Sequence, residues 1–320
     1  MENNGFSSVT VRGVPLIQQY PGRVWWVQNS SNLPEGSAPG SDSGNEGTYT
    51  KPFATIDYAI GNCVASRGDI IAVMPGYTQT ITLATQLVMD VAGIAIVGLG
   101  SGSLRPTLTF GAVAGNIPIT AANMCVTNIL HVNNFADITS NYTATGTAAP
   151  TNLAIENCEF RDTSNILNSL TTLSGNATAN SLDGLSYCRN RVWSLGTTAA
   201  TYSITLLEDA DRVTINDNVT VHAILNDKPG LIECTSKNLT NLQLDRNIGF
   251  RPNTSSTNGS FVGSPGTSCT GMCQGNRFSQ RDTAGAAEWI KANSDLGFAE
   301  NFSHEDYVAD TSAKLWPAAA

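Results

Sequence analysis

The sequence is poor in charged residues, in aromatic residues and in long apolar runs. Charged residues make up 13% of the 320 residues and aromatic residues 7%, whereas charged residues alone reach about a quarter in an average soluble domain. So few charges disfavour exposed, salt-bridged helices and favour strands with many turns. No run approaches the roughly eighteen apolar residues that a membrane helix needs. Hydrophobic residues make up 41% of the whole chain, which argues against disorder.

Basic residues are scarce as well. There are 17 Lys and Arg against 26 Asp and Glu, and the formal net charge is −9. An acidic surface repels phosphate backbones, and no run is rich in Lys or Arg, so we predict no binding to nucleic acid and none to membranes. The first twenty residues lack the basic start and apolar core of a secretion signal.

The seven cysteines are dispersed, and no two of them have Cys-x-x-Cys spacing. This placement argues against a disulfide framework or a zinc ribbon. Cys269 and Cys273 with His304 form at most a fragment of a metal site. We therefore predict buried, reduced thiols, folding in a reducing cytoplasm, no metal and no cofactor.

The sequence does contain a repeat of short alternating strands. The stretches NLAIENCEFRDTSN, GLSYCRNRVWS, RVTINDNVTVH and NLQLDRNIGFR share one pattern, and intervals between copies are 26 to 32 residues. Most copies have two apolar residues that alternate as in a strand with one buried face. The residues aligned at the second position are Ile96, Val126, Ile155, Tyr187, Ile215, Leu244, Gln274 and Glu300, of which the last two are polar. Those at the first position are Ile94, Met124, Leu153, Leu185, Val213, Leu242, Met272 and Phe298.

An asparagine and then a bulky residue follow most copies. The asparagines are Asn128, Asn157, Asn190, Asn218, Asn247 and Asn276. Asparagine tolerates left-handed backbone, so we predict a tight corner with a ladder of these side chains. The bulky residues are Phe160, Trp193, Val221, Phe250 and Phe278. We expect them to point into the core on the next strand.

Three short strands and three turns in about 30 residues predict an all-β fold, a single-stranded parallel β-helix of about eight coils. A β-sandwich with chance alternation is disfavoured because the intervals are so constant. A leucine-rich repeat needs shorter periods, and a propeller needs longer blades with a recurrent Gly or Trp signature.

The expected organisation has four parts. Residues 1–22 form an N-terminal arm, 23–92 an initial strand, long loop, cap helix and first coil, 93–310 the remaining coils, and 311–320 a C-terminal tail. We expect the cap helix to start at Thr55, to end at Gly68 and to bury Ile56, Ala59, Ile60, Cys63 and Val64. Trp25, Trp26 and Trp193 are candidates for stacking on sugar rings. Of Trp25 and Trp26, one faces inward, and for the other we favour packing against the loop over binding a partner.

Several motifs resemble the pectin-lyase-like right-handed β-helix proteins of tailed bacteriophage particles. The resemblance covers most of residues 23–310 and is carried by GTYTKPFATIDYAI, GDIIAVMPGYTQT, IVGLGSGSLRPTLTFG and the NCEFRDTS-type coils. Pro52–Ile56 followed by Gly68-Asp69 marks the cap helix, while Gly98–Gly102 with Arg105-Pro106 is more typical of virion proteins. The resemblance implies a right-handed coil and a virion component, either a homotrimer on the capsid or a tailspike.

β-Helix enzymes usually cleave polysaccharides, and a glycoside hydrolase needs paired carboxylates. Candidate carboxylates are Glu156 with Glu159, Asp209 with Asp211, Glu233, and Glu305 with Asp306. None has an evident partner one coil away, so we interpret them as solvated charges. His131, His222 and His304 lie in different coils, and we expect them at the surface or at corners. The glycines from Gly98 to Gly102 lack the helix and lysine of a phosphate loop, so we predict a tight turn there.

We therefore predict a non-enzymatic capsid decoration, or cement, protein made in the bacterial host cytoplasm and located on the virion surface. As a homotrimer it would bind the major capsid protein and stabilise the assembled shell. The arm would add a strand to a partner through Val9, Val11, Val14, Leu16, Ile17 and Tyr20. Two alternatives stay open: a tailspike-like protein that binds or cuts a host glycan between subunits, and a plain adhesin.

Overall fold

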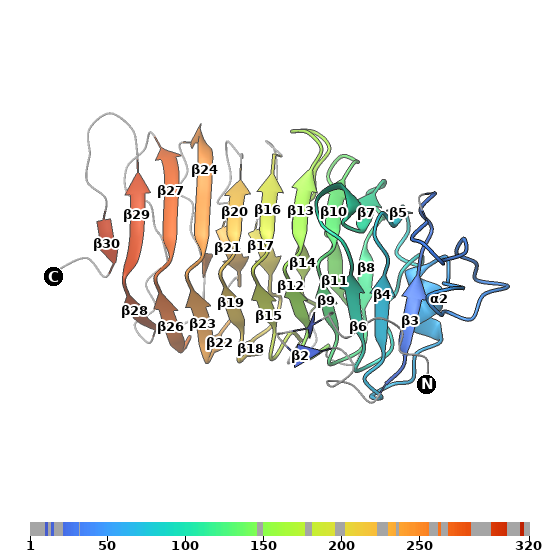
Figure 1. Cartoon of the computed structure of the whole chain (residues 1–320). Helices are drawn as coiled ribbons and strands as arrows, with labels where there is room; N and C mark the ends of the chain where they lie inside the picture. Colours follow the sequence, from blue (N-terminus) through green and yellow to red (C-terminus); the bar gives the residue numbers. More distant parts are fainter. Residues whose placement is uncertain are drawn as a thin grey trace.

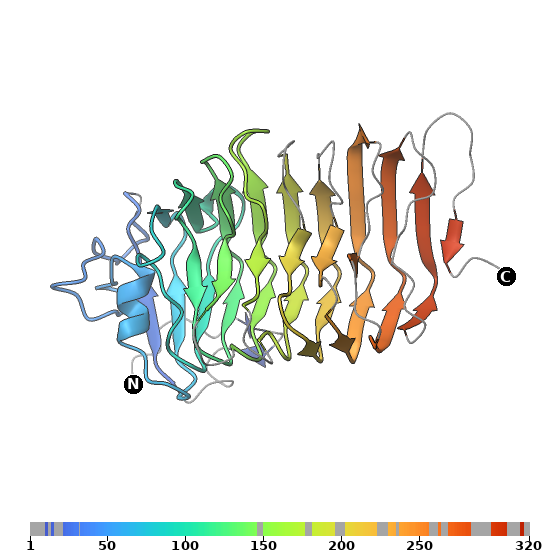
Figure 2. The same ribbon diagram turned by 180° about the vertical axis from the view of Figure 1, so that it is seen from behind.

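The computed structural model describes residues 10–11, 14–15, 22–31, 33–145, 150–176, 181–195, 202–222, 230–234, 237–255, 262–263, 268–282, 296–305 and 314–316. The described chain winds as a parallel β-helix in which three long sheets run side by side along one axis (Figures 1 and 2). None of the described helices is long and apolar enough to cross a membrane.

The first sheet is formed by β3 (Val24–Val27), β4 (Ile70–Val73), β6 (Ala95–Gly98), β9 (Cys125–Thr127), β12 (Ala154–Glu156), β15 (Ser186–Cys188), β19 (Thr214–Asn216), β23 (Leu242–Asp245), β26 (Gly271–Gln274) and β28 (Leu296–Ala299). The second is formed by β5 (Thr78–Ile81), β7 (Thr107–Phe110), β10 (Leu130–Asn133), β13 (Glu159–Asp162), β16 (Arg191–Ser194), β20 (Val219–His222), β24 (Ile248–Ser255), β27 (Arg277–Asp282), β29 (Asn301–Glu305) and the antiparallel β30 (Lys314–Trp316).

The third sheet is formed by β8 (Ile117–Ile119), β11 (Tyr142–Ala144), β14 (Leu173–Ser174), β17 (Tyr202–Thr205), β21 (Gly230–Glu233) and β25 (Val262–Gly263). Six turns of the described chain therefore have a strand in all three sheets, somewhat fewer than the eight coils predicted. Two short pairs lie outside these sheets: the antiparallel β1 (Thr10–Val11) and β2 (Val14–Pro15), and the parallel β18 (Ala210–Asp211) and β22 (Leu239–Thr240). Right-handedness stays a prediction from the resemblance.

A column of inward side chains runs through the first sheet. The column confirms the predicted alignment of the copies from Ile96 to Leu244. Each of these residues lies beside its counterpart in the next coil. The last two positions were predicted wrongly, because the register places Cys273 and Phe298 in the column instead of Gln274 and Glu300. The column packs into one continuous core, as expected when no single coil can bury its apolar face alone.

The second sheet corrects three of the predicted inward residues. Phe160 and Phe278 are buried as expected. Trp193, Val221 and Phe250 lie one residue beyond the inward positions, so their side chains face outward. The inward residues beside them are Val192, Thr220 and Gly249.

Two histidines predicted at the surface or corners are buried instead. His131 lies inside the second sheet, where its ring stacks on Phe160 at 4.3 Å between centroids. One of its ring nitrogens is 2.7 Å from the Tyr142 hydroxyl. His222 is also inward-facing on β20.

The cap helix α2 (Ile56–Gly61) covers the first coils. The Thr55 hydroxyl accepts a hydrogen bond from the Tyr58 nitrogen, as an N-cap should, and Ile56, Ala59 and Ile60 are buried. The helix ends at Gly61 rather than near Gly68, and Val64 is exposed. Gly68 instead has a positive φ of 80° in the turn that leads into β4.

The two tryptophans of β3 divide as predicted. Trp25 faces the core and stacks on Phe53 at 5.5 Å. Trp26 faces outward and packs edge-on against Tyr49 of the long loop at 5.2 Å. The outward tryptophan therefore has the packing role.

The predicted asparagine ladder exists, but with a partly different membership. It consists of Asn190, Asn218, Asn247, Asn276 and Asn301, all buried at the corner between the first and second sheets. Each ladder side chain accepts a hydrogen bond from the backbone nitrogen of the equivalent residue in the preceding coil. Asn128 and Asn157 instead occupy the preceding corner position, with φ of 57° and 52°.

Candidate functional site

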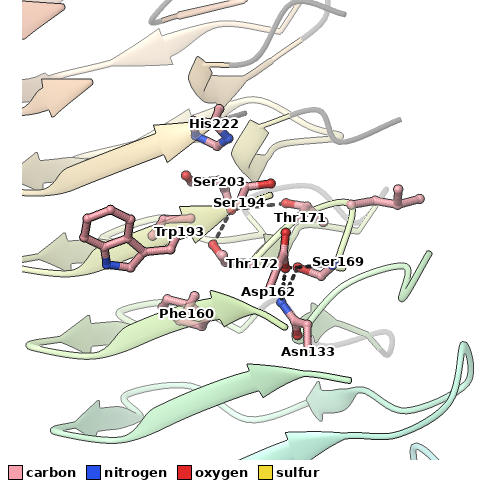
Figure 3. Close-up of a pocket in the computed structure, with 12 residues that line it drawn as sticks. Asn133, Phe160, Asp162, Ser169, Thr171, Thr172, Trp193, Ser194, Ser203 and His222 are labelled. Carbon is pink, nitrogen blue, oxygen red and sulfur yellow. Dashed lines mark hydrogen bonds between the residues drawn. The ribbon is translucent and has the colours of Figure 1, made fainter. Parts of the chain in front are cut away.

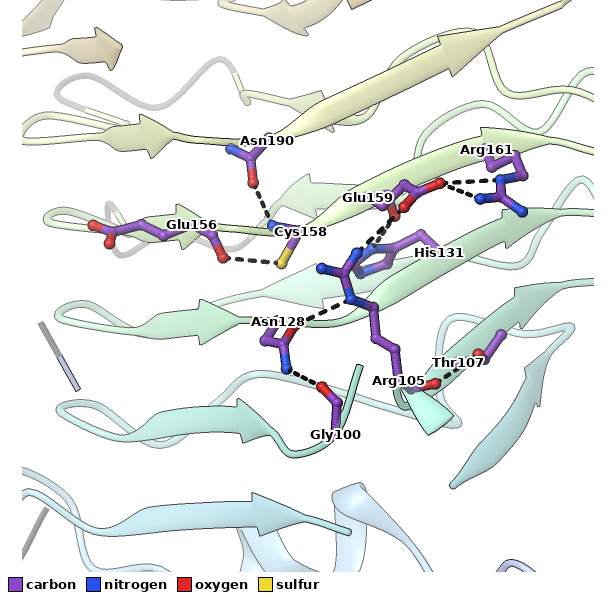
Figure 4. Close-up of polar contacts among 10 residues, drawn as sticks. All are labelled: Gly100, Arg105, Thr107, Asn128, His131, Glu156, Cys158, Glu159, Arg161 and Asn190. Carbon is purple, nitrogen blue, oxygen red and sulfur yellow. Dashed lines mark hydrogen bonds and ion pairs between the residues drawn. The ribbon is translucent and has the colours of Figure 1, made fainter. Parts of the chain in front are cut away.

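The glycine-rich segment Gly98–Gly102 forms the predicted tight turn at this corner. A Cβ at Gly98 would lie 2.2 Å from the Asn128 carbonyl oxygen, so only glycine fits. Gly100 has a φ of 93°, which side chains rarely tolerate. The Asn128 amide closes the turn by donating to the carbonyl of Gly98 at 2.8 Å and to that of Gly100 at 3.0 Å; Figure 4 shows the contact with Gly100. The short 3₁₀ helix η1 (Gly102–Leu104) then directs the chain to Arg105.

Arg105 reaches from this turn across two coils. Its Nε donates to the Asn128 side-chain oxygen at 3.1 Å, and its Nη1 lies 3.3 Å from Oε2 of Glu159 (Figure 4). The other carboxylate oxygen of Glu159 is held by Arg161. Glu159 therefore bridges two guanidinium groups and holds both near the start of β13.

Two more arginines complete a hollow of about 520 Å³ beside this corner. Arg189 pairs with Glu156 at 2.6 Å. Arg191 is exposed on the outer side of β16 and has no side-chain hydrogen bond or ion pair with the described residues. We call this site the arginine hollow; its lining is Gly102, Ser103, Arg105, Leu130, Asn157, Cys158, Glu159, Arg161, Arg189 and Arg191.

The charge of the arginine hollow differs in sign from that of the whole chain. Four arginines line it, and the paired carboxylates are Glu156 and Glu159, so the formal surplus is two positive charges. The chain as a whole carries −9. Guanidinium groups stay protonated and bind carboxylate, phosphate or sulfate oxygens in a planar fork. Its volume falls in the range of small-molecule sites.

An exposed aromatic ring adjoins the arginine hollow. Trp193 on β16 lies directly beside Arg161 on β13, and its side chain is 41% exposed. Arg191 and Trp193 are two residues apart on one strand and face the same side. An exposed guanidinium, without a side-chain partner among the described residues, and a partly exposed indole therefore lie next to each other on the outer surface.

A second, buried pocket lies inside the same coils. It is lined by Asn133, Phe160, Asp162, Ser169, Leu170, Thr171, Thr172, Val192, Trp193, Ser194, Ser203 and His222 (Figure 3). Asp162 accepts hydrogen bonds from Asn133 at 2.8 Å and from the Leu195 nitrogen at 2.8 Å. The pocket measures only about 10 Å³, no more than one water occupies. A sugar does not fit there.

The carboxylates considered from the sequence are dispersed. Glu156 and Glu159 flank one corner, and each is bound to arginine. Asp209 and Asp211 lie elsewhere, near β18, and accept hydrogen bonds from residues of the following coil. Hydrogen bonds from Thr240 and Asn241 are the main cause of the lowered pKa of Asp211.

The proposed partner-binding arm is only partly described. Val11 lies in β1 and Val14 in β2, and these strands pair with each other. The other four residues, Val9, Leu16, Ile17 and Tyr20, lie outside the described residues. Whether the arm joins a partner's sheet stays a prediction.

Sequence reasoning missed the arginines. The four arginines come from three coils, since Arg105 and Arg161 lie in two of them and Arg189 and Arg191 share the third. One signal was present, because Glu159 and Arg191 occupy equivalent positions and neighbouring outward residues stack. Using it required the strand register to be correct within one residue.

The described strands and the hollow define a parallel β-helix with a cationic surface site. No protein-family model matches the chain, and no curated protein sequence matches it. A similar solved structure is described as a rhamnogalacturonan lyase. It is 14% identical, the match covers 88% of this chain and 87% of that chain, and the TM-score is 0.41.

This comparison corrects the prediction that the protein is not an enzyme. The similar structure is that of a lyase, so a solenoid of this kind gives no ground for excluding catalysis. At 14% identity, the chemistry of this chain has to be inferred from its own residues.

Proposed function

We propose that the protein binds an acidic glycan at the arginine hollow, as a tailspike-like protein does under the alternative drawn from the sequence. The observation that carries this proposal is Arg191, an exposed guanidinium without a side-chain partner in the described chain, next to three further arginines.

An acidic group is favoured over a neutral one because of the local charge. Arg105 and Arg161 already share Glu159, which holds them in place. Arg191 is left to pair with an oxyanion of the ligand. Hydrogen bonds to charged groups contribute about 1.5–3 kcal/mol each, which corresponds to at least about tenfold in affinity.

A sugar is favoured as the carrier of that group because of Trp193. Its exposed ring offers an apolar face beside the charged hollow. Indole combines a large apolar surface with a polar edge and loses little conformational entropy when it is covered. A pyranose ring has an apolar face of matching size and a polar rim.

The test compares dextran with dextran sulfate, which share one backbone and differ in charge, and adds alginate as a carboxylated polymer. Binding is measured by calorimetry for the wild type, Arg191→Gln and Arg212→Gln. Arg212 is a matched control, because it is exposed and forms an ion pair with Asp211 outside the hollow. The same samples are assayed for new sugar ends, which separates a binding protein from a depolymerase.

We expect the two acidic polymers to bind more tightly than dextran. Arg191→Gln is expected to weaken that binding about tenfold, whereas Arg212→Gln leaves it unchanged. Equal binding of dextran and dextran sulfate, or equal losses in the two variants, would contradict the proposal. The virion location, the major capsid protein as partner and the homotrimer stay predictions.

A further inference from the structure

Beyond the arginine hollow, the outer side of the second sheet carries an apolar strip. It consists of Trp193, Val219, Val221, Ile248 and Phe250, and we call it the aromatic strip. Ile248 and Phe250 are each 45% exposed, close to the value for Trp193. Trp193, Val221 and Phe250 lie in one row across three adjacent strands, and Val219 and Ile248 lie in the parallel row.

In the second of these rows an arginine flanks the two apolar residues on each side. Its order is Arg191, Val219, Ile248 and Arg277, each in register with the next. Arg277 is exposed and, like Arg191, has no side-chain hydrogen bond or ion pair with the described chain. Adjacent strands are about 4.8 Å apart, so the Cα atoms of the two arginines lie about 14 Å apart along the axis.

We infer that the glycan is a chain lying along the solenoid axis, in which neutral sugars separate the acidic ones. One acidic group lies at Arg191 and the next at Arg277, and the sugars between them cover the aromatic strip. This inference rests on the proposed function, since it extends the same site. A polymer with a charge on every sugar fits poorly, because the charges between the arginines would lie on Val219 and Ile248.

The strip favours a glycan over a bare apolar partner because of what surrounds it. The row through Trp193 includes Arg161, which lines the hollow, so the two surfaces are continuous. The charged ends and apolar middle match a ligand with the same alternation. Covering the two aromatic rings removes apolar surface from water and adds affinity without adding charge.

The experiment uses fragments of gellan, a linear polymer in which neutral sugars separate the glucuronates, in a series of increasing length. Alginate fragments of equal length serve as the uniformly charged comparison. The proteins are the wild type, Phe250→Ala, Arg277→Gln and Arg191→Gln. Met272→Ala is the control, because Met272 is similarly exposed but lies on the first sheet. All five proteins are checked for folding and for oligomeric state by sedimentation.

We expect affinity for gellan fragments to rise about tenfold or more once a fragment carries two glucuronates. Phe250→Ala and Arg277→Gln are expected to remove this gain while leaving short fragments unaffected. Arg191→Gln is expected to weaken every fragment, and Met272→Ala to change nothing. Alginate fragments should bind more weakly than gellan fragments of equal length.

Three results would overturn the inference. The first is an affinity that does not depend on the length of the gellan fragment. The second is a rise in affinity with fragment length that persists in both Phe250→Ala and Arg277→Gln. In either case continued sensitivity to Arg191→Gln would leave the proposed function standing. The third is a change of oligomeric state in Phe250→Ala, which would make the strip a contact between copies. Loss of the proposed function itself would appear separately, as insensitivity of all binding to Arg191→Gln.

Discussion

The side-chain oxygen of Asn190 accepts a hydrogen bond of 2.9 Å from the backbone nitrogen of Cys158, and with this bond the asparagine ladder reaches its N-terminal end. The equivalent corner residues before it are Cys158 and Ile129, which lack the amide needed to continue the ladder. In these coils Arg105 and Asn128 tie the corner together on the outside instead. The arginine hollow therefore lies where the buried asparagine ladder ends and the outer contact between Arg105 and Asn128 takes its place.

Replacing a central ladder residue should cost substantial stability. Asn218 donates to the Tyr187 carbonyl and to Asn247, and it accepts from the Asn190 nitrogen. Asn218→Leu keeps the volume but leaves buried polar groups unsatisfied, at about 1–3 kcal/mol each. We expect the free energy of unfolding in urea to fall by about 2 kcal/mol or more. Gln274→Leu, at an exposed position, is the control, and equal losses in both variants would contradict this account.

Gly98→Ala should disturb both the corner and the hollow. The added Cβ would meet the Asn128 carbonyl oxygen at 2.2 Å, so the turn that positions Arg105 must shift. We expect lower stability together with weaker binding of dextran sulfate. Gly61→Ala is a matched control, because no atom lies within 4 Å of its added Cβ and the position is helical. Unchanged binding by a folded Gly98→Ala protein would disprove the link between turn and hollow.

Asp69 should make the free energy of unfolding depend on pH in the acid range. Burial raises the pKa of its carboxyl, but hydrogen bonds from Arg67 and the backbone nitrogens of Val64 and Arg23 outweigh burial, and the pKa lies below its ordinary value. The ionised form is therefore the stabilising one, and its contribution is lost as pH falls below about 4. In Asp69→Asn we expect lower stability at pH 7 and a shallower loss in acid. Urea midpoints from pH 7 to 2 measure both, and parallel curves would speak against the assignment.

His131 should remain neutral in the folded protein. Burial lowers its pKa to about 3, whereas the ring in the unfolded chain binds a proton near pH 6.5. Stability should therefore decline as pH falls from about 6.5 towards 3, because only the unfolded chain takes up this proton. Ring resonances followed by nuclear magnetic resonance should not shift between pH 8 and 5. A titration midpoint near 6 would show that the ring is accessible.

The buried thiols should be unreactive until the protein unfolds. All seven cysteines are reduced thiols, and burial raises the pKa of Cys158 and of Cys273 to about 12. At neutral pH both are protonated, and the thiolate is the reactive form. We expect a thiol reagent to modify them only at the rate of global unfolding, and to titrate seven groups in urea. Fast labelling of either residue in the native protein would show that the core is open.

The regular part of the solenoid was predictable because its copies agree with one another. From Ile96 to Leu244 every copy keeps the apolar-x-apolar pattern, and the structure confirms the alignment. The last copies offer several alternations, so Cys273 was missed and Phe298 was assigned to the first position of its copy instead of the second. The ladder would have placed them, since from Tyr187 onward each inward residue of the column stands three positions before a buried asparagine.

The outer surface was less predictable because it depends on single-residue register. Trp193 was assigned to the core from its distance to the corner, and one residue decides whether that side chain faces in or out. The arginine hollow depends on register in several coils at once, and no local pattern in the sequence brings Arg105 next to Glu159.

The last strand gives the solenoid a defined length. β30 runs antiparallel to β29, whereas every other strand of the second sheet is parallel to its neighbours. Because β30 is reversed, the direction of the strand at this edge differs from that of the coils before it. A stack of coils whose edge repeats indefinitely is a template for fibres. The reversed strand β30 therefore interrupts the parallel repeat of coils at this end of the second sheet.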